Sequence, residues 1–248
     1  MVDAAGIILS CFLSLFAGGA VKGLVGLGLP VIGMPLLTLT LPLKTAIAIL
    51  VVPLVVSNLS QSFEGGLFRW TLKRFWPTLA TLFVSAAVST QALVALPERT
   101  LFTAAGTAII VLPLITYFYP ALRIGPSLER WLGPCVGTIG GFLGGVSAFY
   151  GPPLMIFLAA LRLPKAEFVP AISLMFFVGA LGLAVGLLGF GVSGTRELGL
   201  SALATLPVFV GMSLGRRVRI ALNERQFALL LLAIYVVIGT TFLLKGLA

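Results

Sequence analysis

A single lysine lies in the middle of one of the two most glycine-rich stretches of the chain. Residues 18–30 read GGAVKGLVGLGLP, with Lys22 between two long uncharged runs. Glycine and proline at this density favour an interrupted helix, which leaves free backbone N–H groups at the positive end of a helix dipole. With the lysine ammonium added, such a place favours a small bound anion. An alternative interpretation puts Lys22 in a turn between two spans, where it would extend to water at the membrane surface.

A second stretch of the same kind occupies residues 140–153 and reads GGFLGGVSAFYGPP. It adds Ser147 and Tyr150, whose hydroxyl groups could face Lys22, and a proline pair that begins at Pro152. Glycines four residues apart also occur where helices pack closely, so packing is an alternative role for them. Packing does not explain the proline that follows each cluster. We therefore predict two interrupted helices, with a binding site where they meet.

A third polar group, residues 57–62, reads SNLSQS and places Asn58 and Gln61 at the end of an apolar run. Each amide can donate two N–H bonds, which suits an oxyanion that has lost its water. Alternatively, both amides lie at the membrane surface or bond to neighbouring helices. The matching residues 177–182 are apolar, so we expect an asymmetric cavity. The candidate anion-binding residues are Lys22, Gly18, Gly19, Gly23, Asn58, Gln61, Gly144, Gly145, Ser147, Tyr150 and Pro152.

The sequence offers little for catalysis or for metal binding. It contains no histidine, and all seven acidic residues fall in predicted loops or at helix ends. A membrane-embedded hydrolase needs a base or metal ligands, and histidine is the usual source of both. We therefore predict no catalytic residues, no metal site and no cofactor. The lack of core carboxylates also argues against a carboxylate proton relay, so we expect an anion uniporter or coupling by another device.

The composition indicates that the elements holding these residues lie in a membrane. The 248 residues are 59% hydrophobic and 9% charged, whereas globular domains carry roughly 25% charged residues. Uncharged runs of about 20 residues, the length of a membrane-spanning helix, recur along the chain. The net charge of +9 is scattered between these runs, which indicates cytoplasmic loops and no nucleic-acid-binding face. The predicted fold class is all-α, a polytopic transmembrane helical bundle without a soluble domain.

The chain also contains an internal repeat. At an offset of 122 residues, eight of 25 positions are identical, among them Pro30 with Pro152. We predict a first transmembrane repeat at 1–122 and a second at 123–248, each with about five apolar segments. An odd number of segments makes the second repeat inverted. One set of loops holds eleven lysines and arginines and the other four, which predicts both termini outside the cell. The first two segments of each repeat either cross fully or form a Gly/Pro-broken, re-entrant pair.

Both Gly-rich breaks are followed by a proline-containing segment and then by Leu-Pro, at 41–42 and at 163–164. In a short chain of two inverted halves, this pattern resembles the sulfite exporter TauE/SafE family of permeases. The resemblance covers the whole chain in architecture and is strongest in motif at 16–62 and 137–182. It implies export, or in some members uptake, of sulfite, sulfonates or related sulfur-containing organic anions across a plasma membrane. It also makes the following residues candidates for the cavity: Lys22, Pro152 and the glycines at 18, 19, 23, 140, 141, 144 and 145.

The resulting functional hypothesis is a secondary transporter that exports such an anion by alternating access. Its partners would be the small anionic substrate and the lipid bilayer. Two alternatives remain. An anion channel would give currents too large for a carrier. A non-transporting membrane subunit or assembly factor would copurify with partner proteins and would not be stabilised by small ligands.

Overall fold

The computed structural model describes residues 4–25, 29–118, 123–219 and 224–247 of the chain. Within these ranges all regular structure is helical, because in lipid a helix satisfies its own backbone hydrogen bonds. The all-α prediction is confirmed. In chain order the elements are α1 (Ala4–Val25), α2 (Leu29–Leu37), α3 (Leu43–Ser62), the 3-10 turn η1 (Glu64–Gly66), α4 (Phe68–Ala95), α5 (Glu98–Phe118), α6 (Pro126–Ser147), α7 (Gly151–Ala160), α8 (Lys165–Gly189), α9 (Thr195–Arg219) and α10 (Glu224–Leu247).

Several of these helices are long and apolar enough to cross a bilayer. Among the described residues, five segments satisfy both conditions. The chain is therefore a multi-pass membrane protein, as its composition predicts. The five segments are Gly6–Leu24, Leu43–Ser62, Phe68–Ala95, Ala166–Gly189 and Thr195–Arg217.

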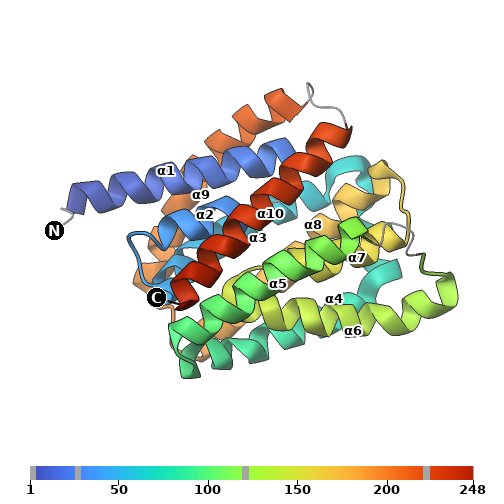
Figure 1. Ribbon diagram of the computed structural model, residues 1–248, viewed down its shortest axis with the longest axis horizontal. Coiled ribbons are helices and arrows are strands. Elements are labelled where there is room, and N and C mark those ends of the chain that lie inside the picture. The colour runs from blue at the N-terminus through green and yellow to red at the C-terminus, as the bar shows by residue number, and fades with distance from the viewer. Residues whose placement is uncertain (1–3, 26–28, 119–122, 220–223, 248) are drawn as a thin grey trace.

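The two halves of the chain have the same order of long and short helices (Figure 1). In each half a helix of 22 residues precedes a short one, α2 with 9 residues and α7 with 10. At 1.5 Å per residue, a helix of this length covers about half of the ~30 Å hydrocarbon core. Neither short helix can cross the bilayer alone. Both lie largely buried among the long helices.

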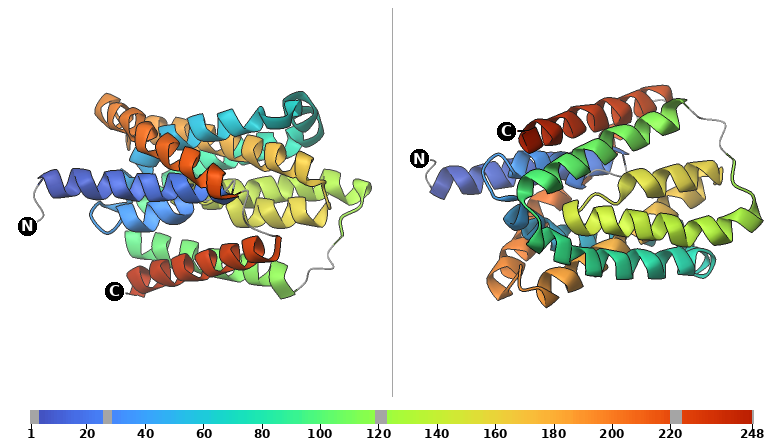
Figure 2. Two further views of the ribbon diagram at one scale, coloured as in Figure 1. Left: turned by 90° about the horizontal axis from the view of Figure 1, so that it is seen from above. Right: turned by 60° about the horizontal axis from the view of Figure 1, so that its bottom comes forward.

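Helix contacts between the halves are reciprocal. Helix α1 packs on α9 as α6 packs on α4, and α3 packs on α9 as α8 packs on α4. Helices α3 and α8 contact each other, and so do α5 and α10, which lie side by side along one flank of the bundle (Figure 2). Each of these contacts between the halves therefore has an equivalent in which the two halves exchange roles.

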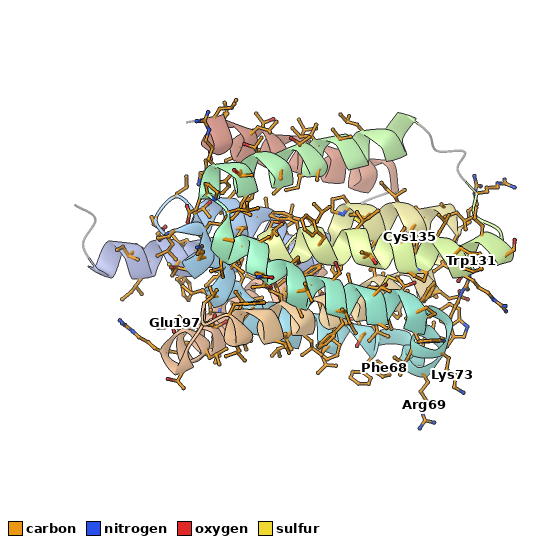
Figure 3. All side chains as sticks on the ribbon, turned by 90° about the horizontal axis from the view of Figure 1, so that it is seen from below. Phe68, Arg69, Lys73, Trp131, Cys135 and Glu197 are labelled. Atoms are coloured by element: carbon orange, nitrogen blue, oxygen red, sulfur yellow. The ribbon has the colours of Figure 1, made fainter. Side chains whose placement is uncertain are left out.

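Charged side chains lie at both ends of the bundle (Figure 3). Figure 3 shows Arg69, Lys73 and Trp131 at one end and Glu197 at the other. Both termini of the chain lie at the Glu197 end (Figures 1 and 3). At the opposite end, ion pairs join Arg74 to Glu129 at 2.7 Å and Arg216 to Glu64 at 2.8 Å.

Candidate functional site

The first Gly-rich stretch is helical up to Val25 and again from Leu29, so the predicted interruption can fall only at residues 26–28. Helix α1 continues through Gly18 and Gly23 to Val25, and α2 begins at Leu29 with Pro30 in its first turn. A glycine inside a helix costs only about 1 kcal/mol relative to alanine, which close packing can offset. Proline is tolerated in a first turn because the N–H it lacks would have no helical partner there. Residues 26–28, between the two helices, lie outside the described ranges.

The second Gly-rich stretch contains a sharp break between α6 and α7. Ala148, directly after α6, has φ 62° and ψ 11°, in the left-handed region that is strained for an alanine. The Ser147 hydroxyl donates to the Leu143 carbonyl oxygen at 2.6 Å and accepts from the Phe149 N–H at 3.3 Å. It is thus used in the turn, and Ser147 does not line the cavity described next. Pro152 lies in the first turn of α7, which begins at Gly151, and does not interrupt it.

A small cavity lies where the two stretches meet. Its volume is about 20 Å³, which is room for roughly one water molecule. The first half contributes helices α1, α2 and α3, and the second half contributes the turn before α7, the start of α7, and α8. The lining residues are Lys22, Pro30, Val31, Leu54, Asn58, Phe149, Tyr150, Gly151, Pro152 and Phe176.

Lys22 is buried at this cavity, with 1% of its surface exposed. Its Nζ donates to Asn58 Oδ1 at 2.5 Å, and Asn58 Nδ2 donates to the Leu54 carbonyl oxygen at 2.8 Å, which fixes the orientation of the amide. No ion pair involves Lys22 in the part of the chain that the structure describes. The interpretation in which Lys22 extends to water at the membrane surface does not fit this burial.

Tyr150 is the second polar side chain of the cavity. It is 2% exposed, and its hydroxyl has no hydrogen-bond partner among the described residues. The ring lies against Gly144 and Gly179, where a Cβ on either glycine would overlap it, and its centroid is 6.3 Å from that of Phe176. Gly144 therefore acts indirectly, by making room for the tyrosine.

The other predicted glycines bring helices together and do not line the cavity. Gly18 faces α2, where a Cβ would lie 2.9 Å from the Leu29 carbonyl oxygen. Gly19 and Gly23 face the backbone of α9, and Gly145 faces α4. Of the two further glycines that the resemblance implied, the one at 140 faces Leu154 of α7 and the one at 141 faces α4. These positions agree with the packing role of four-residue glycine spacings.

Gln61 lies one turn beyond Asn58 on α3 but does not line the cavity. It is 1% exposed, and its Oε1 has no partner within the described ranges. The structure therefore brings together four of the predicted residues: Lys22, Asn58, Tyr150 and Pro152.

Sequence reasoning missed the apolar walls of the cavity, above all Phe149 and Phe176. Phe149 could have been found, because it precedes Tyr150 directly in the break. Phe176 has no such signal, because it lies in a helix where apolar residues occupy nearly every position.

A larger cleft of about 970 Å³ lies elsewhere, between α5, α4 and α6. Threonines and aliphatic side chains make up most of its lining, and Arg99 is its charged residue. Arg99 Nε donates to the Gly246 carbonyl oxygen at 2.8 Å, at the C-terminal end of α10. Its charge is therefore engaged in capping a helix, and we place the candidate site at the smaller, buried cavity.

Comparison with known protein families gives a match. The model of the family described as sulfite exporter TauE/SafE matches residues 11–242, which is nearly the whole chain. Neither the curated proteins nor the solved structures contain a match. Residues 11–242 include every described residue that lines the buried cavity. The chain belongs to the sulfite exporter TauE/SafE family.

Proposed function

We propose that this chain is a secondary transporter that moves a small sulfur-containing anion, such as sulfite or an organosulfonate, across the plasma membrane. Proteins of the TauE/SafE family are membrane transporters of sulfur anions. The observation that carries the proposal is Lys22, a buried lysine without a carboxylate partner in the described structure, at the cavity where the two Gly/Pro-rich stretches meet.

The chemistry of the cavity favours an anionic guest. An ammonium group buried without a counter-charge is unfavourable, and a bound anion removes that penalty. The anion replaces Asn58 Oδ1 as the acceptor of the Lys22 N–H, and the Tyr150 hydroxyl, which has no partner among the described residues, donates a second hydrogen bond to it. Phe149 and Phe176 exclude water, which strengthens both interactions.

The arrangement of the helices supports a carrier. The cavity has walls from both halves of the chain, so a rocking of one half against the other would open it to each side in turn. The reciprocal helix contacts support two related repeats, and the charge bias of the loops supports their inversion. For an anion that crosses alone, a cytoplasm negative by about 100 mV favours exit by about 2.3 kcal/mol, whereas an anion that crosses with a proton gains nothing from this potential.

A thermal-stability screen tests the binding of the substrate. We expect sulfite, thiosulfate or a short sulfonate to stabilise the purified protein, by about 2.7 kcal/mol at 100 times the dissociation constant. Lys22→Gln should lose this stabilisation, whereas Lys73→Gln, at an exposed lysine, should keep it. If none of these anions, nor sulfate or carboxylates, stabilises the wild-type protein, the proposal is wrong.

Flux in proteoliposomes separates the alternatives. A carrier should give saturable uptake of the stabilising anion that Lys22→Gln abolishes. Single-channel currents would instead indicate an anion channel. Absence of both flux and current, together with copurifying proteins, would indicate a non-transporting subunit.

A further inference from the structure

We propose that Lys22 takes up a proton when the anion binds, so that the proton and the anion cross the membrane together. The proposal rests on the proposed function of the same cavity, and it adds the coupling ion. It also identifies the device that replaces a carboxylate relay, for which the sequence offers no core residue.

Among the described residues, the surroundings of Lys22 contain no net charge that balances an ammonium ion. Helix α2 has no titratable side chain, and α3 presents the neutral amide of Asn58. The charges that act on Lys22 from α9 and η1 are Arg216 and Glu64, of opposite sign, which form an ion pair with each other at 2.8 Å. From the turn before α7 comes Tyr150, a neutral phenol with 2% of its surface exposed.

An empty site of this kind favours the neutral amine. A buried charge that lacks a partner is so unfavourable that the group usually changes its protonation state instead. The contact between Lys22 and Asn58 does not require the charge, because an amine N–H donates to the amide oxygen as an ammonium N–H does. An arriving anion reverses the preference, since it pairs with the ammonium form in a site that excludes water.

The proposed cycle conserves protons and charge. On the side where the anion enters, the Lys22 amine takes a proton from water and becomes an ammonium that pairs with the anion. After the cavity opens to the other side, the anion leaves, the proton returns to water, and the amine remains. Each cycle moves one proton with one anion, so a monovalent anion crosses without net charge.

Proton uptake on binding tests this directly. Methanesulfonate is the probe, because its charge is fixed and any titration then belongs to the protein. We expect purified wild-type protein in weakly buffered detergent solution to take up about one proton per anion bound at alkaline pH, with an affinity that falls about tenfold per pH unit there. Binding without proton uptake at every pH between about 6 and 10 would overturn the proposal. If methanesulfonate, sulfite and thiosulfate all fail to bind, the proposed function fails as well.

Lys22→Arg provides a second measurement, because a guanidinium group stays protonated at these pH values. We expect it to bind methanesulfonate without proton uptake, and Lys73→Arg to behave as the wild type does. In proteoliposomes held at zero membrane potential, an acidic outside should drive uptake of methanesulfonate by the wild type and not by Lys22→Arg. Full proton uptake by Lys22→Arg would assign the proton to another group and contradict the proposal.

Discussion

Lys22 and Tyr150 line the same cavity, but they differ in hydrogen bonding. Lys22 donates to Asn58 Oδ1, whereas the Tyr150 hydroxyl has no partner within the described ranges. A buried hydroxyl without a hydrogen bond costs about 1–3 kcal/mol. Few such groups occur in native proteins, and each calls for an explanation, such as a ligand that completes it. The proposed anion is that ligand.

Tyr150→Phe separates the effect of the hydroxyl on protein stability from its contribution to anion binding. Without anion, we expect the variant to be as stable as the wild type or up to about 1 kcal/mol more stable, since an unsatisfied group is removed. With anion, the stabilisation should fall by about 1.5–3 kcal/mol, the worth of a hydrogen bond to a charged group. Thermal unfolding with and without the anion measures both. A variant that loses stability without anion and keeps the full ligand response would assign the hydroxyl a structural role.

At the scale of the residue, sequence chemistry identifies the polar groups of the cavity but not which glycines face it. Lys22, Asn58 and Tyr150 are conspicuous because polar side chains are rare in apolar runs. A glycine looks the same in sequence whether it borders a cavity or a neighbouring helix. Only the orientation of α1 shows that Gly19 and Gly23 face the backbone of α9.

At the scale of the element, α1 shows how packing overrides helix propensity. Its three glycines disfavour a helix, yet α1 continues through them to Val25 because α9 fills the space that side chains at Gly19 and Gly23 would occupy. Most long helices begin and end within about five residues of an uncharged run, but α4 begins at Phe68 and includes Arg69 and Lys73. The break at Ala148 is predicted to within a few residues, since Pro152 and Pro153 mark the start of α7.

Gly23→Ala and Gly33→Ala form a matched pair that tests this packing. A Cβ at Gly23 would overlap the Met212 backbone, whereas at Gly33 the nearest atom is Leu50 Cδ2 at 3.6 Å. We expect Gly23→Ala to destabilise the protein by about 1–3 kcal/mol through overpacking. Gly33→Ala should be neutral or stabilising by up to about 1 kcal/mol, because alanine favours the helix. Equal effects on the unfolding temperature would contradict the role assigned to Gly23.

At the scale of the whole molecule, the reciprocal contacts show how the two halves of the chain pack together. Composition and hydropathy do not predict this packing. The self-similarity at an offset of 122 residues predicts the repeat, but it does not say which helices touch. The pairing of α1 with α9 and of α6 with α4 depends on distant segments, so it becomes visible only in the folded chain. The inversion of the repeats and the location of the termini remain predictions from the loop charges.

Cysteine labelling tests that orientation. In a chain with Cys11 and Cys135 replaced by alanine, a membrane-impermeant maleimide should label Arg196→Cys in intact cells. Lys73→Cys, at the opposite end of the bundle, should react only after the cells are permeabilised. Arg196 and Lys73 are both exposed, so reactivity reports the side of the membrane. The reverse pattern would place the termini in the cytoplasm.

The hollow beside Lys22 measures about 20 Å³, the room of roughly one water molecule, and a sulfonate needs far more. A guest can therefore load only while the walls move apart, and they belong to both halves of the chain. Turnover is then set by how often the walls separate. It should rise steeply on warming, as slow collective motions do, and approach a plateau when the guest is plentiful.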